Sequence, residues 1–176
     1  MTTEDAELLQ HYLARGHEPW NLSLESAWLD YELRSFVLSR LPAHRPLSVC
    51  NVGIGVGLWD DWLAHAVGHA ITSVDRDPEI CRIFEIRQRR ERHPFPSKII
   101  CADVRDGVLD GCAFDVITCV GSTLDESGDR GRTQQALLRA LAPAGQLLLG
   151  EVGRGAHGDR VLARGDMWLA CSTRTL

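Results

Sequence analysis

Three alternating glycines, Gly53, Gly55 and Gly57, form the part of the sequence with the clearest chemical meaning. They come directly after an apolar run and directly before a helix-like segment that starts at Leu58. A strand that turns into a helix through such glycines carries little side-chain bulk, so its backbone can approach a ligand closely and present free amide groups to it. The pattern therefore predicts a ligand-binding loop at this turn.

An acidic residue, Asp75, ends the next apolar run of the chain, 22 positions after Gly53. At the carboxyl end of the second strand of a parallel α/β sheet, an acid at this distance from a glycine loop binds the two hydroxyls of a ribose. The alternative is a carboxylate that serves the following helix, where Asp77 and Pro78 form a strong N-terminal signal. We favour the ribose contact, so the glycines and Asp75 together predict a nucleoside-binding site.

The segments that must position these residues alternate between strands and helices. Near-continuous apolar runs, separated by segments of helical length, are typical of βαβ crossovers in a mostly parallel sheet with helices on both faces. An antiparallel edge strand at Met167–Ser172, the second half of a hairpin, is expected to complete this three-layer α/β sandwich. The expected strands are residues 46–52, 70–75, 98–102, 114–120 and 146–151, and the expected helices are residues 58–68, 77–90 and 131–141, with a short helix or turn at 105–112.

Two further helices, at residues 4–15 and 23–41, are expected before the first strand. We expect residues 1–45 to form an N-terminal helical cap and residues 46–176 to form the ligand-binding domain, in one compact unit. The basic run at residues 87–92 is either a phosphate patch or the solvated end of an amphipathic helix, and we favour the helix end.

Composition limits the classes of partner and location. The 176 residues carry a net charge of −5, which disfavours a nucleic-acid partner. No secretory signal and no apolar stretch of membrane-spanning length are visible, so we expect no membrane contact and a cytoplasmic location. His65 and His69 lie four positions apart, but no third ligand is apparent, so we expect no metal site.

These motifs resemble those of the class I S-adenosylmethionine-dependent methyltransferases over residues 46–152. Residues 49–57 are similar to the first motif of that family, in which a strand is followed by an acid and three alternating glycines, and Val74 and Asp75 are similar to the second. The later motifs are matched by residues 101–103, 114–119 and 137–149. The resemblance implies a Rossmann-like fold and S-adenosyl-L-methionine as the cofactor.

The resemblance also implies a set of cofactor contacts. Asp75 would hold the ribose, and Asp103 would bind the adenine amine. Asn51 stands where the family has an acid; it can still accept a hydrogen bond, but without the charge, so we expect weakened rather than abolished binding. The full set of cofactor-binding residues is Asn51, Gly53, Gly55, Gly57, Asp75, Arg76, Asp103, Val104 and Cys119.

The expected reaction is in-line methyl transfer to a small-molecule acceptor, as in secondary metabolism. The methyl donor is already activated by its positive charge, so the protein mainly aligns the acceptor and excludes water. A general base is needed only where the acceptor keeps its proton, and the candidates are Asp125, Glu126 and His17. Trp59, just past the glycines, either anchors its helix or contacts the adenosine.

Two other functions stay open. The first is a non-catalytic, methyltransferase-like subunit that binds the cofactor or acts as a scaffold, which Asn51 and the abbreviated region after the fifth strand support. The second, weaker one is a nicotinamide-dependent enzyme, whose loop would need glycine at the position of Leu58. The abbreviated C-terminal region leaves the substrate to be covered by the N-terminal helices, by a second copy in a homodimer or by a partner subunit.

Overall fold

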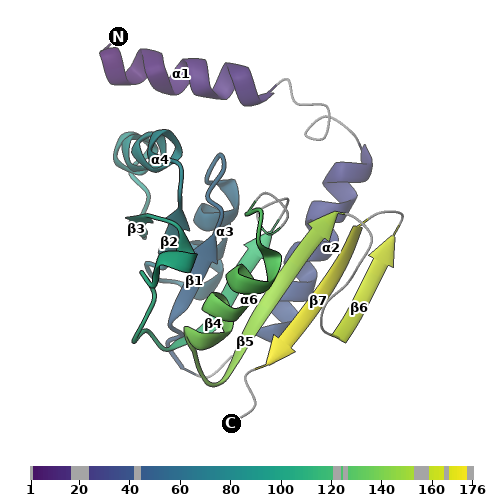
Figure 1. Cartoon of the computed structure of the whole chain (residues 1–176). Coiled ribbons are helices and arrows are strands. Elements are labelled where there is room, and N and C mark those ends of the chain that lie inside the picture. The colour runs from purple at the N-terminus through teal and green to yellow at the C-terminus, as the bar shows by residue number, and fades with distance from the viewer. Residues whose placement is uncertain are drawn as a thin grey trace.

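The computed structural model describes residues 2–16, 24–41, 45–120, 124, 127–152, 159–164 and 167–173. Within these residues the chain forms an α/β fold around one seven-stranded sheet with the strand order β3-β2-β1-β4-β5-β7-β6 (Figure 1). Among the described residues, no helix has both the length and the apolar character needed to cross a membrane.

Five parallel strands make up the part of the sheet that positions the candidate site. Their order reverses between β1 and β4, because the chain first builds outward through β2 and β3 and then returns to the other side of β1. In open α/β sheets, ligands bind at the carboxyl ends of the strands beside such a switch point. The strands are β1 (Val49–Val52), β2 (Thr72–Asp75), β3 (Lys98–Cys101), β4 (Phe114–Val120) and β5 (Leu141–Val152).

The fifth strand begins earlier than the sequence pattern predicts. Leu141 already pairs with Phe114, and the register then shifts before Val116 pairs with Gln146. A Cβ on Gly145 would lie 2.6 Å from the Phe114 carbonyl oxygen, so only glycine fits at this irregularity. The Pro and Gly residues that indicate a turn in the sequence therefore lie inside β5.

Two further strands extend the sheet beyond β5. The strand expected at the edge is β7 (Met167–Thr173), which pairs antiparallel with β5. It is not the edge of the sheet, because β6 (Asp159–Arg164) pairs antiparallel with β7 on its outer side. The hairpin expected around this strand is therefore present, with β6 as its first half and β7 as its second half.

Local signals fix the helices next to the site. α4 (Pro78–Glu91) starts after Asp77, whose carboxylate accepts a hydrogen bond from the Glu79 N–H at 2.8 Å, as the sequence predicts. α3 (Leu58–Val67) lies between two glycines in the left-handed region, Gly57 and Gly68. The remaining helical elements are α1 (Thr3–Gly16), α2 (Leu24–Arg40), η2 (Val104–Asp106) and α6 (Arg130–Arg139).

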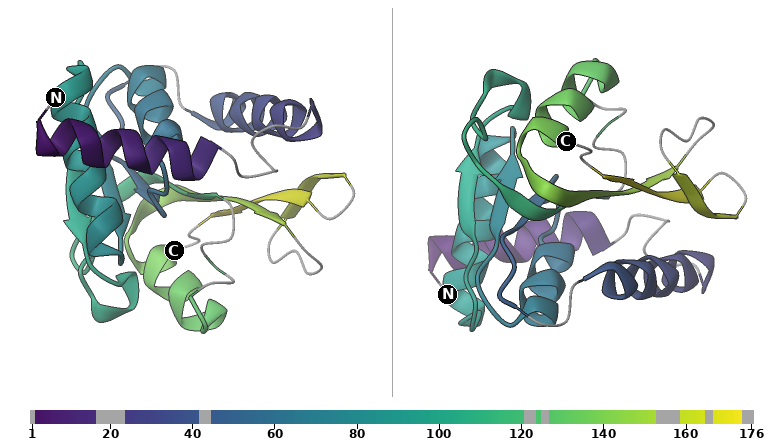
Figure 2. Two further views of the ribbon diagram at one scale, coloured as in Figure 1. Left: turned by 90° about the horizontal axis from the view of Figure 1, so that it is seen from above. Right: turned by 90° about the horizontal axis from the view of Figure 1, so that it is seen from below.

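Helices cover the two faces of the sheet separately (Figure 2). On one face, Val37 of α2 and Leu63 of α3 are fully buried against strand residues such as Val116. On the other face, Leu137 of α6 is fully buried against residues such as Ile117. Val116 and Ile117 are consecutive residues of β4 and point to opposite faces of the sheet, as expected for a strand that is buried on both faces.

Candidate cofactor site

The glycine loop joins β1 to α3 in a conformation that its glycines make possible. Gly53, Gly55 and Gly57 have φ angles of 91°, 54° and 75°, all in the region that other residues rarely adopt. The Gly53 N–H donates to the Val74 carbonyl at 2.9 Å, and the Gly57 N–H donates to the Ile54 carbonyl at 2.8 Å. The loop is therefore tied to β2 at its start and closed by its own turn.

Close packing by α4 adds a second requirement at Gly57. A Cβ at this position would lie 2.3 Å from a ring carbon of Phe84 and 3.0 Å from Nη1 of Arg87. No side chain fits in that space, so the third glycine of the pattern allows α4 to lie directly against the loop.

The Asp75 carboxylate is held between the glycine loop and the start of α4. Its Oδ2 accepts from the Ile54 N–H at 2.8 Å, and its Oδ1 accepts from the Asp77 N–H at 3.0 Å. These two amide donors orient the carboxylate at the carboxyl end of β2, next to the loop. The carboxylate thus contacts the start of the helix, as one interpretation of the sequence expects. It also borders the pocket described next, where the other interpretation expects a ribose.

A pocket opens where the ends of β1, β2 and β3 face the start of α6. Gly53, Asp75, Arg76, Asp103 and Val104 were predicted as site residues and line it, whereas Asn51, Gly55, Gly57 and Cys119 are not among its lining residues. Ser127 and Thr133 were not predicted, because only the fold brings the α6 region to the ends of these strands. The complete lining is Val52, Gly53, Val74, Asp75, Arg76, Ala102, Asp103, Val104, Ser127 and Thr133.

Asp103 borders the pocket but is also engaged by Arg105. Its Oδ1 accepts from the Arg105 backbone N–H and Nε, both at 2.9 Å, and its Oδ2 accepts from Nη2 at 2.6 Å. The hydrogen bonds from Arg105 lower the pKa of Asp103 to about 2, so the carboxylate is charged at neutral pH. Asp103 therefore caps η2 and also lines the pocket. Its contact with the adenine amine stays a prediction.

Asn51 belongs to β1, and its side chain is fully buried beneath the glycine loop. Its amide nitrogen donates to the Gly53 carbonyl at 3.1 Å and to the Asp60 carboxylate at 3.0 Å. Its carbonyl accepts from the Thr118 hydroxyl at 2.8 Å, and the Trp59 indole N–H donates to the same hydroxyl at 3.2 Å. Asn51 therefore supports the loop from the core, and Trp59 anchors α3 into that network.

Asp60 supplies the carboxyl group of this network and lies, fully buried, in the first turn of α3. Burial raises the pKa of Asp60 to about 7, against the opposing effects of the Ser73 hydroxyl and the Asn51 amide. Neither Asp60 Oδ1 nor Ser73 Oγ has a well-aligned hydrogen bond within the described part of the chain. With a pKa of about 7, Asp60 is present in both its protonated and its ionised form near neutral pH, whereas an exposed carboxyl group would be fully ionised.

The sequence analysis also singled out Cys119, two histidines of α3 and its C-terminal end, and three candidate bases. Cys119 is buried in the core on the α6 face, so its side chain packs as a small apolar group. His65 and His69 each bind a backbone carbonyl, those of Asp61 and Ala70, and no group of three metal-binding side chains occurs among the described residues. The proposed bases Asp125, Glu126 and His17 lie outside the described residues.

Comparison with known proteins assigns the chain to a family. A sequence profile described as a methyltransferase domain matches residues 49–145, more than half of the chain. The chain belongs to this family, the class I S-adenosylmethionine-dependent methyltransferases with a Rossmann-like fold, which confirms the resemblance of its motifs. The cofactor of the family is S-adenosyl-L-methionine. No curated protein matches the sequence.

Solved structures share the fold at low sequence identity. The cyclase SpnF is 26% identical, with a TM-score of 0.60 over 73% of this chain and 48% of its own. A methyltransferase from Geobacter sulfurreducens in complex with S-adenosyl-L-homocysteine is 22% identical, with a TM-score of 0.56 over 70% of this chain and 48% of its own. The plantazolicin methyltransferase BpumL, in complex with a pentazolic desmethylPZN analogue and S-adenosylhomocysteine, is 15% identical, with a TM-score of 0.59 over 86% of this chain and 55% of its own. This chain thus spans about half the length of each of them.

Proposed function

We propose that this protein transfers a methyl group from S-adenosyl-L-methionine to a small-molecule acceptor by in-line displacement. The observation that carries the proposal is the position of Asp75. Its carboxylate is fixed by the Ile54 amide of the glycine loop and borders a pocket at the carboxyl ends of β1, β2 and β3. A carboxylate in that place can accept hydrogen bonds from both hydroxyls of a ribose.

The residues around the pocket fit the remainder of a nucleoside cofactor. Gly53 lets the backbone come close to a ligand, and Asp103 supplies a second, charged acceptor for an exocyclic amine. When bound, S-adenosyl-L-methionine supplies a methyl group on a positively charged sulfur. The chain then has to hold the acceptor in line with that group and exclude water. We keep Asp125, Glu126 and His17 as candidates for moving a proton where the acceptor needs it.

A small acceptor agrees with the charge of the chain and with one relative. The net charge of −5 gives a polyanionic substrate little attraction. BpumL, which shares the fold, is described as the plantazolicin methyltransferase. We therefore favour a small molecule of the kind made in secondary metabolism over a nucleic acid, with a second copy or a partner subunit as a further source of cover for the acceptor.

A second candidate function is a scaffold or cofactor-binding subunit without catalysis. The observation that favours it is Asn51, whose uncharged amide occupies the position of the acid in the first motif and is used entirely within the protein. In this case the fold persists while one cofactor contact is lost.

Calorimetric titration separates these functions. We expect micromolar dissociation constants for S-adenosylmethionine and S-adenosylhomocysteine and no binding of NAD. Binding of both, together with formation of S-adenosylhomocysteine when mixed small-molecule acceptors are added, supports the transferase. If neither sulfur compound binds at millimolar concentration, the transferase is excluded and the scaffold subunit is favoured.

A further inference from the structure

A buried arginine on α4, Arg87, contacts the backbone of the glycine loop. The Arg87 side chain is only 5% exposed, although it belongs to the basic run that the sequence suggests is solvated. Its Nη1 donates to the Val56 carbonyl at 2.8 Å, its Nε donates to Glu91 Oε2 at 2.9 Å, and its Nη2 lies 3.8 Å from Asp61 Oδ2. The guanidinium thus joins the loop, α4 and α3.

These contacts give Arg87 control over the shape of the loop. A buried charge is stable only when its donors are paired, and the planar guanidinium has fixed donor directions. The position of the group therefore fixes the direction of the Val56 carbonyl. The next residue, Gly57, has room for no side chain beside this same Nη1 atom. A displacement of Arg87 would have to change the loop.

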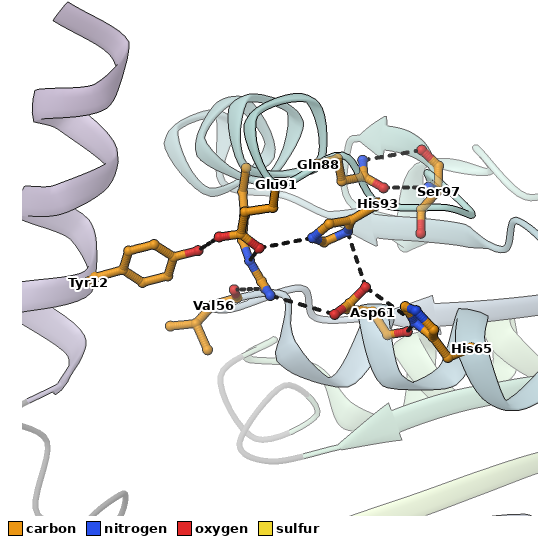
Figure 3. Close-up of polar contacts among 9 residues, drawn as sticks. Tyr12, Val56, Asp61, His65, Gln88, Glu91, His93 and Ser97 are labelled. Carbon is orange, nitrogen blue, oxygen red and sulfur yellow. Dashed lines mark hydrogen bonds and ion pairs between the residues drawn. The ribbon is translucent and has the colours of Figure 1, made fainter. Parts of the chain in front are cut away.

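Glu91 contacts both Arg87 and Tyr12, and Tyr12 belongs to the N-terminal helix α1 (Figure 3). The Tyr12 hydroxyl of α1 donates to Glu91 Oε1, while Glu91 Oε2 accepts from Arg87 and lies 3.0 Å from His93 Nε2. Burial, followed by the hydrogen bond to Glu91, raises the pKa of Tyr12 to about 12, so the phenol keeps its proton and remains a donor at neutral pH. His93 also lies 3.2 Å from Asp61, which closes the network around Arg87.

Other contacts hold α1 along α4 without reaching the loop. Arg82 pairs with Glu7 at 2.5 Å, and Arg89 pairs with Glu4 at 2.6 Å. Arg90 lies 3.3 Å from both Glu4 and Asp5. These pairs are well exposed to solvent, so each contributes little stability on its own. Because these ion pairs join α1 to α4 without involving Arg87, their removal can be compared with removal of the Tyr12 hydroxyl.

We propose that Arg87 is a positioning residue for the cofactor loop, and that α1 sets its position through Tyr12 and Glu91. Docking of the N-terminal helix onto α4 and the binding-competent shape of the loop are then linked. The inference rests on the proposed function for the identity of the ligand, but the linkage itself is a property of the free protein. It gives α1 a role in cofactor binding without direct contact with the cofactor.

The test compares Tyr12→Phe and Arg87→Lys with the matched control Glu7→Gln. Tyr12→Phe removes only the hydroxyl, and Arg87→Lys keeps the charge but cannot serve the Val56 carbonyl and Glu91 with fixed geometry. Glu7→Gln weakens the same helix seam at the contact with Arg82. Amide hydrogen exchange at Ile54 and Gly57, whose N–H groups are hydrogen-bonded in the loop, is measured without ligand, and the S-adenosylhomocysteine dissociation constant is measured by calorimetry.

We expect Tyr12→Phe and Arg87→Lys to exchange these amides at least about threefold faster and to bind S-adenosylhomocysteine about 3- to 10-fold more weakly, since loosened loop states do not bind ligand. Glu7→Gln should match wild type in both measurements. The proposal would be overturned if Tyr12→Phe and Glu7→Gln had equal effects, or if amide exchange were unchanged in both Tyr12→Phe and Arg87→Lys. Absence of binding by the wild-type protein would count against the proposed function alone, because the exchange measurement still decides the linkage.

Discussion

Asn51→Asp should restore the acid of the family motif and yet destabilise the protein by about 3–5 kcal/mol at pH 8. The amide nitrogen of Asn51 lies 3.0 Å from the Asp60 carboxylate and 3.1 Å from the Gly53 carbonyl. An aspartate would replace this donor by an acceptor and place two fully buried carboxyl groups side by side. Urea unfolding followed by circular dichroism measures the loss.

The same variant should be much less destabilised at low pH. Two adjacent carboxyl groups can share one proton, which replaces the lost amide donor between them. The double variant Asn51→Asp/Asp60→Asn reverses the polarity of the pair and should recover most of the stability at pH 8, because one amide again faces one carboxylate. A single variant as stable as wild type at pH 8, or a double variant no better than the single one, would contradict this role of Asp60.

Asp60→Asn should remove a loss of stability that the wild-type protein shows as the pH rises. Burial raises the pKa of Asp60 from its ordinary 3.8 to about 7, so the folded state prefers the protonated form. The contribution is therefore fully present below pH 3.8 and is lost as the pH rises through about 7. At about 1.4 kcal/mol per pKa unit, the loss is at most on the order of 4 kcal/mol. Asparagine keeps an oxygen that accepts from Asn51 but has no charge to bury.

The comparison has to be made as a difference between the two proteins. Asp103 and Asp115 have lowered pKa values in the folded protein because arginines bind them, so they stabilise it above their ordinary pKa and lose that effect in acid. Both proteins share these groups, so subtraction removes them. The difference in unfolding free energy between Asp60→Asn and wild type should grow from pH 4 to pH 8; a difference that stays constant would show that Asp60 does not titrate in this range.

Much of the fold follows from local sequence signals. The strand at 114–120 and the start of α4 at Pro78 lie where the pattern places them, because an apolar run between polar breaks and an Asp-Pro cap are fixed by near neighbours. The second antiparallel strand, β6, is the half of the expected hairpin for which the sequence set no bounds, and it pairs with β7. The edge strand β3, at Lys98–Cys101, was nevertheless predicted at residues 98–102, because its short apolar run follows a break marked by prolines.

Some contacts of the candidate site could be predicted from the spacing of motifs along the chain, and others depend on packing that the spacing does not show. The glycine loop and Asp75 do meet, as their spacing suggests. The sequence pattern gives no sign that Asn51 faces the core, since a one-residue change of register would turn it to the other face. Likewise Arg87 reads as one of several solvated arginines, and only the packing of α4 against the loop buries it.

The position of the ribose can be tested through one pair of dissociation constants. S-adenosylhomocysteine should bind Asp75→Ala with an affinity reduced by about 1.5–3 kcal/mol, or about 10- to 150-fold, relative to wild type, because charge-assisted hydrogen bonds to the hydroxyls are lost. Asp77→Ala, which removes the neighbouring helix cap, is the control and should lower stability while leaving affinity unchanged. Equal affinities of wild type and Asp75→Ala would show that the glycine loop and Asp75 do not hold the same adenosine.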